Sequence, residues 1–69
     1  MKIYQLSQLG RRLARSTNNP DTPNWRVIHY LDQQSYATTD QVALGSGLDE
    51  TQASGALVLL RRKGLVEER

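Results

Sequence analysis

Six cationic residues in two groups could bind a polyanion. One group lies near the N-terminus and one near the C-terminus: Arg11, Arg12 and Arg15, then Arg61, Arg62 and Lys63. Such cations contact phosphate groups without reading a sequence of bases. Arginines on the outer face of an amphipathic helix can equally serve only to solvate it, so both interpretations stay open here.

The residue types that catalysis and metal binding need are scarce. The chain has no cysteine and one histidine, His29, with no second histidine or cluster of carboxylates at ligand spacing. Asp32, three residues further on, suits a local hydrogen bond or ion pair with His29. The segment 45–47 (Gly-Ser-Gly) lacks the strand before it and the lysine after it that a phosphate loop has, and predicts a turn. We therefore expect no enzyme activity, no metal and no cofactor.

Length and composition indicate a single domain covering residues 1–69. The 7.8 kDa chain is 38% apolar and 23% charged, which is a balance typical of globular proteins. No apolar run approaches the roughly 20 residues that span a bilayer, and the N-terminus lacks the layout of a signal peptide. We expect a cytoplasmic protein with no membrane partner. The net charge of +2 allows a polyanionic partner without requiring one.

Caps, turn residues and apolar spacing divide the chain into short elements. Thr38 and Gln41 form a capping-box pattern, Thr22 precedes Pro23 at a helix start, and 16–24 reads as a connector. The predicted elements are a strand over 2–6, helices over 7–15, 22–34, 38–44 and 49–63, and a strand over 65–68.

The same spacing predicts which side chains face the core. The strongest period lies in helix 49–63, and the large Trp25 is expected to be buried. The expected inward residues are Leu9, Leu13, Ala14, Trp25, Val27, Ile28, Leu31, Ala53, Ala56, Leu57 and Leu60.

Two helices around a glycine turn carry a family resemblance. Residues 39–56, TDQVALGSGLDETQASGA, resemble a helix-turn-helix, with Ala43 at the close approach of the helices, Gly47 in the turn and Leu48 after it. Continued through LVLLRRKGLVEE, the segment from about 25 to 67 is similar to winged-helix proteins such as the MarR-like and ArsR-like regulators. The resemblance implies a mainly α fold with a small β-sheet, a winged-helix-like domain of three to four helices.

A second resemblance concerns the order of the elements. Residues 3–15, IYQLSQLGRRLAR, are similar to the strand and helix that usually follow the wing in such regulators, but here they come first. We therefore expect strand 2–6 to pair with strand 65–68, as in a circularly permuted winged helix. Lys2 would then lie near Glu67 or Glu68 as a cross-strand pair.

The resemblance implies binding of double-stranded DNA by a transcriptional regulator or a part of one, with a homodimer as a possible assembly. Helix 49–63 would enter the major groove, and the N-terminus of helix 38–44 would approach a phosphate. The residues expected at the groove are Thr51, Ser54, Val58, Arg61 and Arg62, and those expected at phosphates are Arg11, Arg12, Arg15 and Thr38 or Thr39.

The charge distribution favours an alternative. Residues 27–60 contain no lysine or arginine but four acidic residues, of which Asp49 and Glu50 begin the helix that would dock. Carboxylates there repel DNA. Val58 is an apolar residue in the middle of the outward face, with Leu59 also partly outside it. The alternative is a protein-protein interaction module that uses the acidic and apolar face of helix 49–63.

Overall fold

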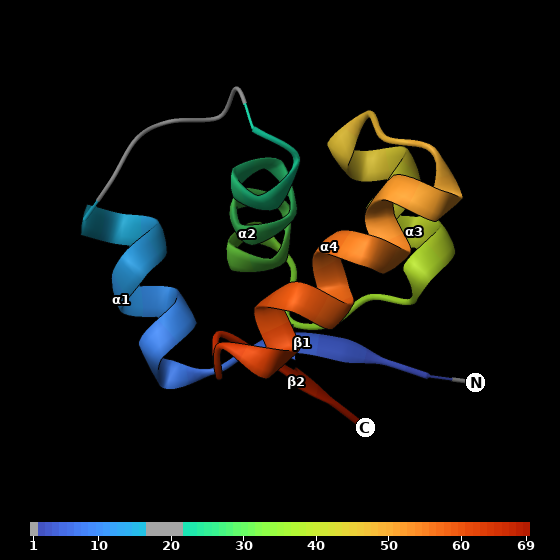
Figure 1. Ribbon diagram of the computed structural model, residues 1–69. Helices are drawn as coiled ribbons and strands as arrows, with labels where there is room; N and C mark the ends of the chain where they lie inside the picture. The colour runs from blue at the N-terminus through green and yellow to red at the C-terminus, as the bar shows by residue number, and fades with distance from the viewer. Residues whose placement is uncertain (1, 17–21) are drawn as a thin grey trace.

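A computed structural model describes residues 2–16 and 22–69, and it is mainly α-helical with a small antiparallel sheet, as predicted. Of the expected connector, residues 17–21 lie outside the described part. Figure 1 shows α1 beside α2, with α4 in front of α3 and the two strands near the lower end of α4. The elements are β1 (Tyr4–Leu6), α1 (Gln8–Ser16), α2 (Pro23–Gln33), α3 (Thr39–Ser46), α4 (Glu50–Arg62) and β2 (Val66–Glu68).

The two strands come from opposite ends of the sequence and pair antiparallel, which confirms the expected pairing. The register places Tyr4 opposite Glu68 and Leu6 opposite Val66. Backbone hydrogen bonds of 3.1 and 2.7 Å between Ile3 and Arg69 continue the ladder. On its other edge, Tyr4 exchanges backbone hydrogen bonds of 2.8 and 2.9 Å with Ala37. β1 therefore lies in the middle, between residue 37 and β2.

Side-chain caps begin the helices where the sequence predicted them. The Ser7 hydroxyl accepts from the Gly10 N–H (3.1 Å), and the Thr22 hydroxyl accepts from Trp25 (3.3 Å). A complete capping box starts each of the next two helices. Thr38 pairs with Gln41 at the start of α3, and Asp49 pairs with Gln52 at the start of α4. Each cap satisfies backbone N–H groups that the first turn of a helix leaves without partners.

The core is the space enclosed by α2, α3, α4 and the sheet. Its largest fully buried side chains are Val27, Ile28, Leu31, Val42 and Leu57. The predicted inward residues of α4 are all buried: Ala53, Ala56, Leu57 and Leu60. Because these residues recur at helical spacing, α4 presents one apolar face to the core and leaves the opposite face in solvent.

The prediction that Leu9 of α1 faces the core is wrong, because its side chain is 56% exposed. Gly10 takes the inward position, because the start of α1 lies directly on the chain before β2. A Cβ atom added to Gly10 would overlap the carbonyl oxygen of Leu65 and would come within 3.1 Å of Leu6 Cδ2. Only a residue without a side chain fits this close approach.

Trp25 is only partly buried and packs against the edge of the core, so the prediction that it is a core residue is correct only in part. It lies in the first turn of α2. Its ring is tilted by 40° to that of His29, with the two ring centroids 6.1 Å apart. Among the described residues, no helix is long and apolar enough to cross a membrane.

Candidate nucleic-acid interface

α3 and α4 are the two helices around a glycine turn that the sequence predicted. Gly47 ends α3 in the left-handed conformation (φ 70°), and the Leu48 N–H donates to Ala43 at 3.0 Å. A left-handed residue at this position reverses the chain at low cost because glycine has no Cβ. Both helices pack against each other and against α2. The buried Ala43 lets the helices come close together.

The predicted groove-facing residues of α4 share one exposed face. It lies opposite the buried alanine and leucine stripe, as the helical spacing required. Val58 is 40% exposed, so this face has an apolar centre between polar ends, and Leu59 beside the face is exposed to the same degree. The exposed residues of this face are Thr51, Ser54, Gly55, Val58, Arg61 and Arg62.

At the C-terminal end of this face, Arg61 is held by the sheet. Its Nη1 atom lies 3.0 Å from Oε1 of Glu68 in β2. The same carboxylate oxygen lies 3.6 Å from Lys2 Nζ and accepts from the Tyr4 hydroxyl at 3.2 Å. The expected pairing of Lys2 with a strand glutamate is therefore formed, with Glu68 as the partner.

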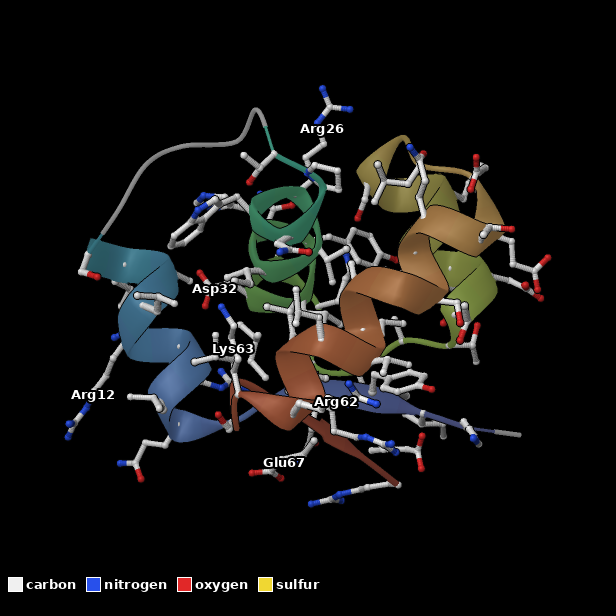
Figure 2. All side chains as sticks on the ribbon, in the orientation of Figure 1. Arg12, Arg26, Asp32, Arg62, Lys63 and Glu67 are labelled. Atoms are coloured by element: carbon white, nitrogen blue, oxygen red, sulfur yellow. The ribbon has the colours of Figure 1, made fainter. Side chains whose placement is uncertain are left out.

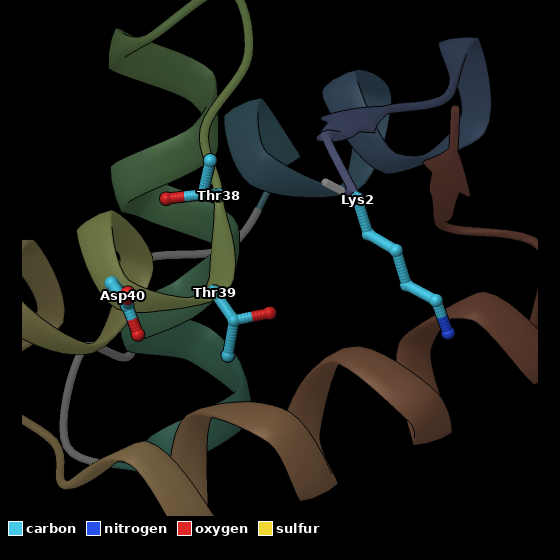
Figure 3. Close-up of a pocket in the computed structure, with 4 residues that line it drawn as sticks. All are labelled: Lys2, Thr38, Thr39 and Asp40. Carbon is cyan, nitrogen blue, oxygen red and sulfur yellow. The ribbon is translucent and has the colours of Figure 1, made fainter.

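A hollow of about 270 Å³ lies at the start of α3, lined by Lys2, Thr38, Thr39 and Asp40. Figure 3 shows Thr38 and Thr39 on one side of it and Lys2 on the other, with the lysine amino group reaching toward α4. The Thr38 hydroxyl accepts from the Gln41 N–H at 3.3 Å, but a hydroxyl keeps a hydrogen that it can donate. The first turn of α3 and the Lys2 side chain therefore line the same hollow, and Asp40 adds a carboxylate to its lining.

The arginines of α1 are exposed, but they do not share the exposed face of α4. α1 packs on α2 and β1, and Figure 2 shows Arg12 extending away from α4. The start of α1 does touch the end of α4, where the Ser7 hydroxyl donates to the Gly64 carbonyl at 2.6 Å. Arg12 lines a shallow hollow there with Glu67. Arg61 therefore pairs with Glu68, whereas Arg12 only shares a hollow with Glu67 and extends away from α4.

Acidic groups remain at the N-terminal end of α4. The Asp49 carboxylate accepts from the Gln52 N–H at 2.7 Å, and Glu50 is exposed beside it. Both favour the helix, because negative charge near an N-terminus complements the helix dipole.

Sequence reasoning assigned no binding role to two cations that the tertiary structure brings to this region, although it did place Lys2 beside a strand glutamate. Lys2 lies beside Arg61 and the start of α3, as described above. Arg26, in α2, reaches the turn before α4, where its Nη1 atom is 3.7 Å from the position that a Cβ of Gly47 would take. Nothing in the local sequence marks Arg26, because only the packing of α2 on α3 places it there.

The expected hydrogen bond or ion pair between His29 and Asp32 is not formed among the described residues. The Nε2 atom of His29 is buried with no hydrogen-bond partner. No group of three or more His, Asp or Glu side chains in the described segments could hold a metal ion.

Comparisons of the chain with protein-family models, with curated proteins and with solved structures found no match.

Proposed function

We propose that this chain is a non-enzymatic, winged-helix-like module that binds double-stranded DNA, as a transcriptional regulator or a part of one. The observation that supports this most is the exposed face of α4, which carries two hydroxyls, one aliphatic side chain and two arginines next to a turn that joins two capped helices. A helix presented in this way fits the major groove, where such side chains contact base edges.

The contacts divide into two kinds. Thr51, Ser54 and Val58 face base edges, with the valine against a thymine methyl group. Phosphate contacts come from Arg61, Arg62 and the start of α3 at Thr38 and Thr39, where the capping box does not use the backbone N–H groups of Thr39 and Asp40. Arg11, Arg12 and Arg15 lie on a separate side of the domain and contact phosphates further along the duplex.

The charges at the two ends of α4 indicate which end lies nearer to the DNA backbone. Asp49 and Glu50 make the N-terminal end of α4 unfavourable for phosphates, whereas its C-terminal end carries Arg61, Arg62 and Lys63. The C-terminal half of α4 therefore lies closest to the DNA backbone. A single module makes few contacts, so a homodimer on two half-sites gains affinity and site length.

The test is a titration of the isotope-labelled protein with a random-sequence duplex at about 50 mM and then about 200 mM salt, with amide shifts followed residue by residue. We expect shifts at residues 51–62, at Thr38 and at Lys2 that shrink at the higher salt. Absence of shifts at the lower salt would reject DNA binding.

The second candidate is a protein-interaction module, and it is favoured by two adjacent apolar side chains on α4. Val58 and Leu59 are each 40% exposed, and the acidic Asp49 and Glu50 precede them on the same helix. In this case Val58→Asp abolishes partner binding, and no DNA-induced shifts occur. The titration thus separates the two functions.

A further inference from the structure

Two cations and one hydroxyl, from the two ends of the chain, converge on one carboxylate oxygen. Glu68 Oε1 lies 3.0 Å from Arg61 Nη1, 3.2 Å from the Tyr4 hydroxyl and 3.6 Å from Lys2 Nζ. A guanidinium, a hydroxyl and an ammonium group are the donors that proteins use to hold a phosphate. The arrangement is therefore an anion site that one of the protein's own carboxylates occupies.

The site combines a fixed part with an open part. Tyr4 is only 7% exposed and belongs to the core, so its hydroxyl keeps its position whichever anion is bound. The side chains of Lys2 and Arg61 are 70% and 47% exposed, and that of Glu68 is 25% exposed. An external anion can therefore reach the cations from solvent. Exposed ion pairs are weak, so Glu68 can be displaced.

We propose that Lys2, Tyr4 and Arg61 form a binding site for a backbone phosphate of DNA, and that Glu68 occupies this site in the free protein. This proposal rests on the proposed DNA binding. It adds one phosphate contact, and it makes the Glu68 carboxylate the group that competes with the phosphate. On binding, a phosphate oxygen takes the place of Glu68 Oε1, and the glutamate side chain turns toward solvent.

The location agrees with the docking direction. Lys2 also lines the hollow at Thr38 and Thr39, where the start of α3 is proposed to meet a phosphate (Figure 3). Arg61 belongs to the exposed face of α4. The site therefore lies between these two proposed contacts, at the cationic end of α4.

The neighbouring glutamate supplies a matched control. Glu67 is the next residue of β2, so its side chain points to the opposite face of the sheet. It is exposed, accepts from Gln5 Nε2 at 3.1 Å, and forms no ion pair with a described lysine or arginine. Glu67→Gln and Glu68→Gln remove the same charge from adjacent positions, but only the second frees Lys2 and Arg61.

The experiment measures the affinity of the wild type and both variants for a random-sequence duplex by fluorescence anisotropy, between about 50 and about 200 mM salt. Glu68→Gln is expected to tighten binding about five- to tenfold more than Glu67→Gln does at the lower salt. The slope of log affinity against log salt concentration should also become steeper by about one to two, because one or two more cations contact phosphates. Adding Arg61→Gln to the Glu68→Gln variant should remove most of this gain.

Equal effects of the two glutamate variants, or weaker binding by Glu68→Gln, would overturn the proposed competition while leaving DNA binding intact. Absence of binding by the wild type and all variants would reject DNA binding itself, and the phosphate site with it. Amide spectra check that each variant is folded. Tyr4→Phe, which keeps the buried ring and removes only the hydroxyl, provides a second route and should reduce the gain in the Glu68→Gln background.

Discussion

The two ends of α4 carry opposite charges, and each charge has a different partner. At the N-terminal end, Asp49 bonds to the backbone of its own helix, and Glu50 follows in the first turn. At the C-terminal end, Arg61 pairs with Glu68 of the sheet. Both arrangements suit the helix dipole, but only the cations suit DNA. The acids at the N-terminal end therefore need no functional explanation, whereas the cations serve both the helix and a polyanion.

The two ends are also held by different neighbours. Toward the N-terminal end, the last turn of α3 packs closely on α2, where a Cβ on Gly45 would overlap the Tyr30 ring. At the C-terminal end, the Leu65 N–H donates to the Leu60 carbonyl at 2.9 Å, and Gly10 of α1 packs against the Leu65 carbonyl. Support at both ends keeps α4 in one orientation, so a single face stays available for a partner.

The largest expected effect comes from breaking the support at the C-terminal end. Gly10→Ala should lower the free energy of unfolding by about 2–3 kcal/mol, because the new methyl group overlaps the Leu65 carbonyl. Urea denaturation measures this loss. The matched control is Gly55→Ala, on the exposed face of α4 with no atom within 4 Å of the new Cβ, and it should raise stability by about 0.5–1 kcal/mol. Equal stabilities of the two variants would contradict the close approach at Gly10.

The next effect tests whether the cationic end of α4 is the DNA-binding end. Changing both Arg61 and Arg62 to Gln should weaken binding to a random duplex about tenfold at about 50 mM salt and flatten the salt dependence. Changing both Arg11 and Arg15 to Gln removes the same charge from α1 and should cost less affinity, because α1 packs on α2 and β1 and its Arg12 extends away from α4 (Figure 2). A larger loss from the α1 pair would place the main contact on α1. Fluorescence anisotropy at two salt concentrations distinguishes the cases.

A smaller effect separates two roles of Asp49, which caps α4 and also places a negative charge near the proposed DNA groove. Asp49→Ala removes the cap of α4 and should lower the free energy of unfolding by about 1 kcal/mol, whereas Asp49→Asn keeps a capping side chain and should lower it by much less. Both variants remove a carboxylate near the proposed groove, and both should bind DNA more tightly. Loss of DNA affinity in Asp49→Asn would show that the acid makes a favourable contact. Thermal unfolding and anisotropy supply the two readouts.

The smallest effect concerns the middle of α4. Val58→Thr keeps the shape of the side chain at a position that is 40% exposed, and it should change the free energy of unfolding by less than about 0.5 kcal/mol. It should alter the preference among duplex sequences without changing the salt dependence, because Val58 is proposed to meet a base rather than a phosphate. Competition between duplexes that differ at single thymines measures this preference. A changed salt dependence would contradict the assignment.

Local features of the sequence were sufficient to predict most elements and the exposed face of α4. Thr38 and Gln41, like Asp49 and Gln52, lie three residues apart, so their capping pattern is visible in the sequence alone. The buried stripe of α4 likewise repeats within one helix. α1 shows where this reasoning fails. Leu9 and Gly10 differ by one position on the helix, and the apolar residue was assigned inward although the glycine is there.

By itself, the sequence determined the helices, their caps, the left-handed turn at Gly47 and the spacing of polar groups along α4. The reason is that hydrogen bonds and periodicity within a helix join residues no more than about four positions apart. Only the tertiary structure decided that Gly10 faces Leu65, that Arg26 reaches the turn at Gly47, and that three donors share one oxygen of Glu68. Tyr4 and Glu68 are 64 positions apart. Their contact exists because the strands at the two ends of the sequence pair, which fixes neighbours that no local pattern specifies.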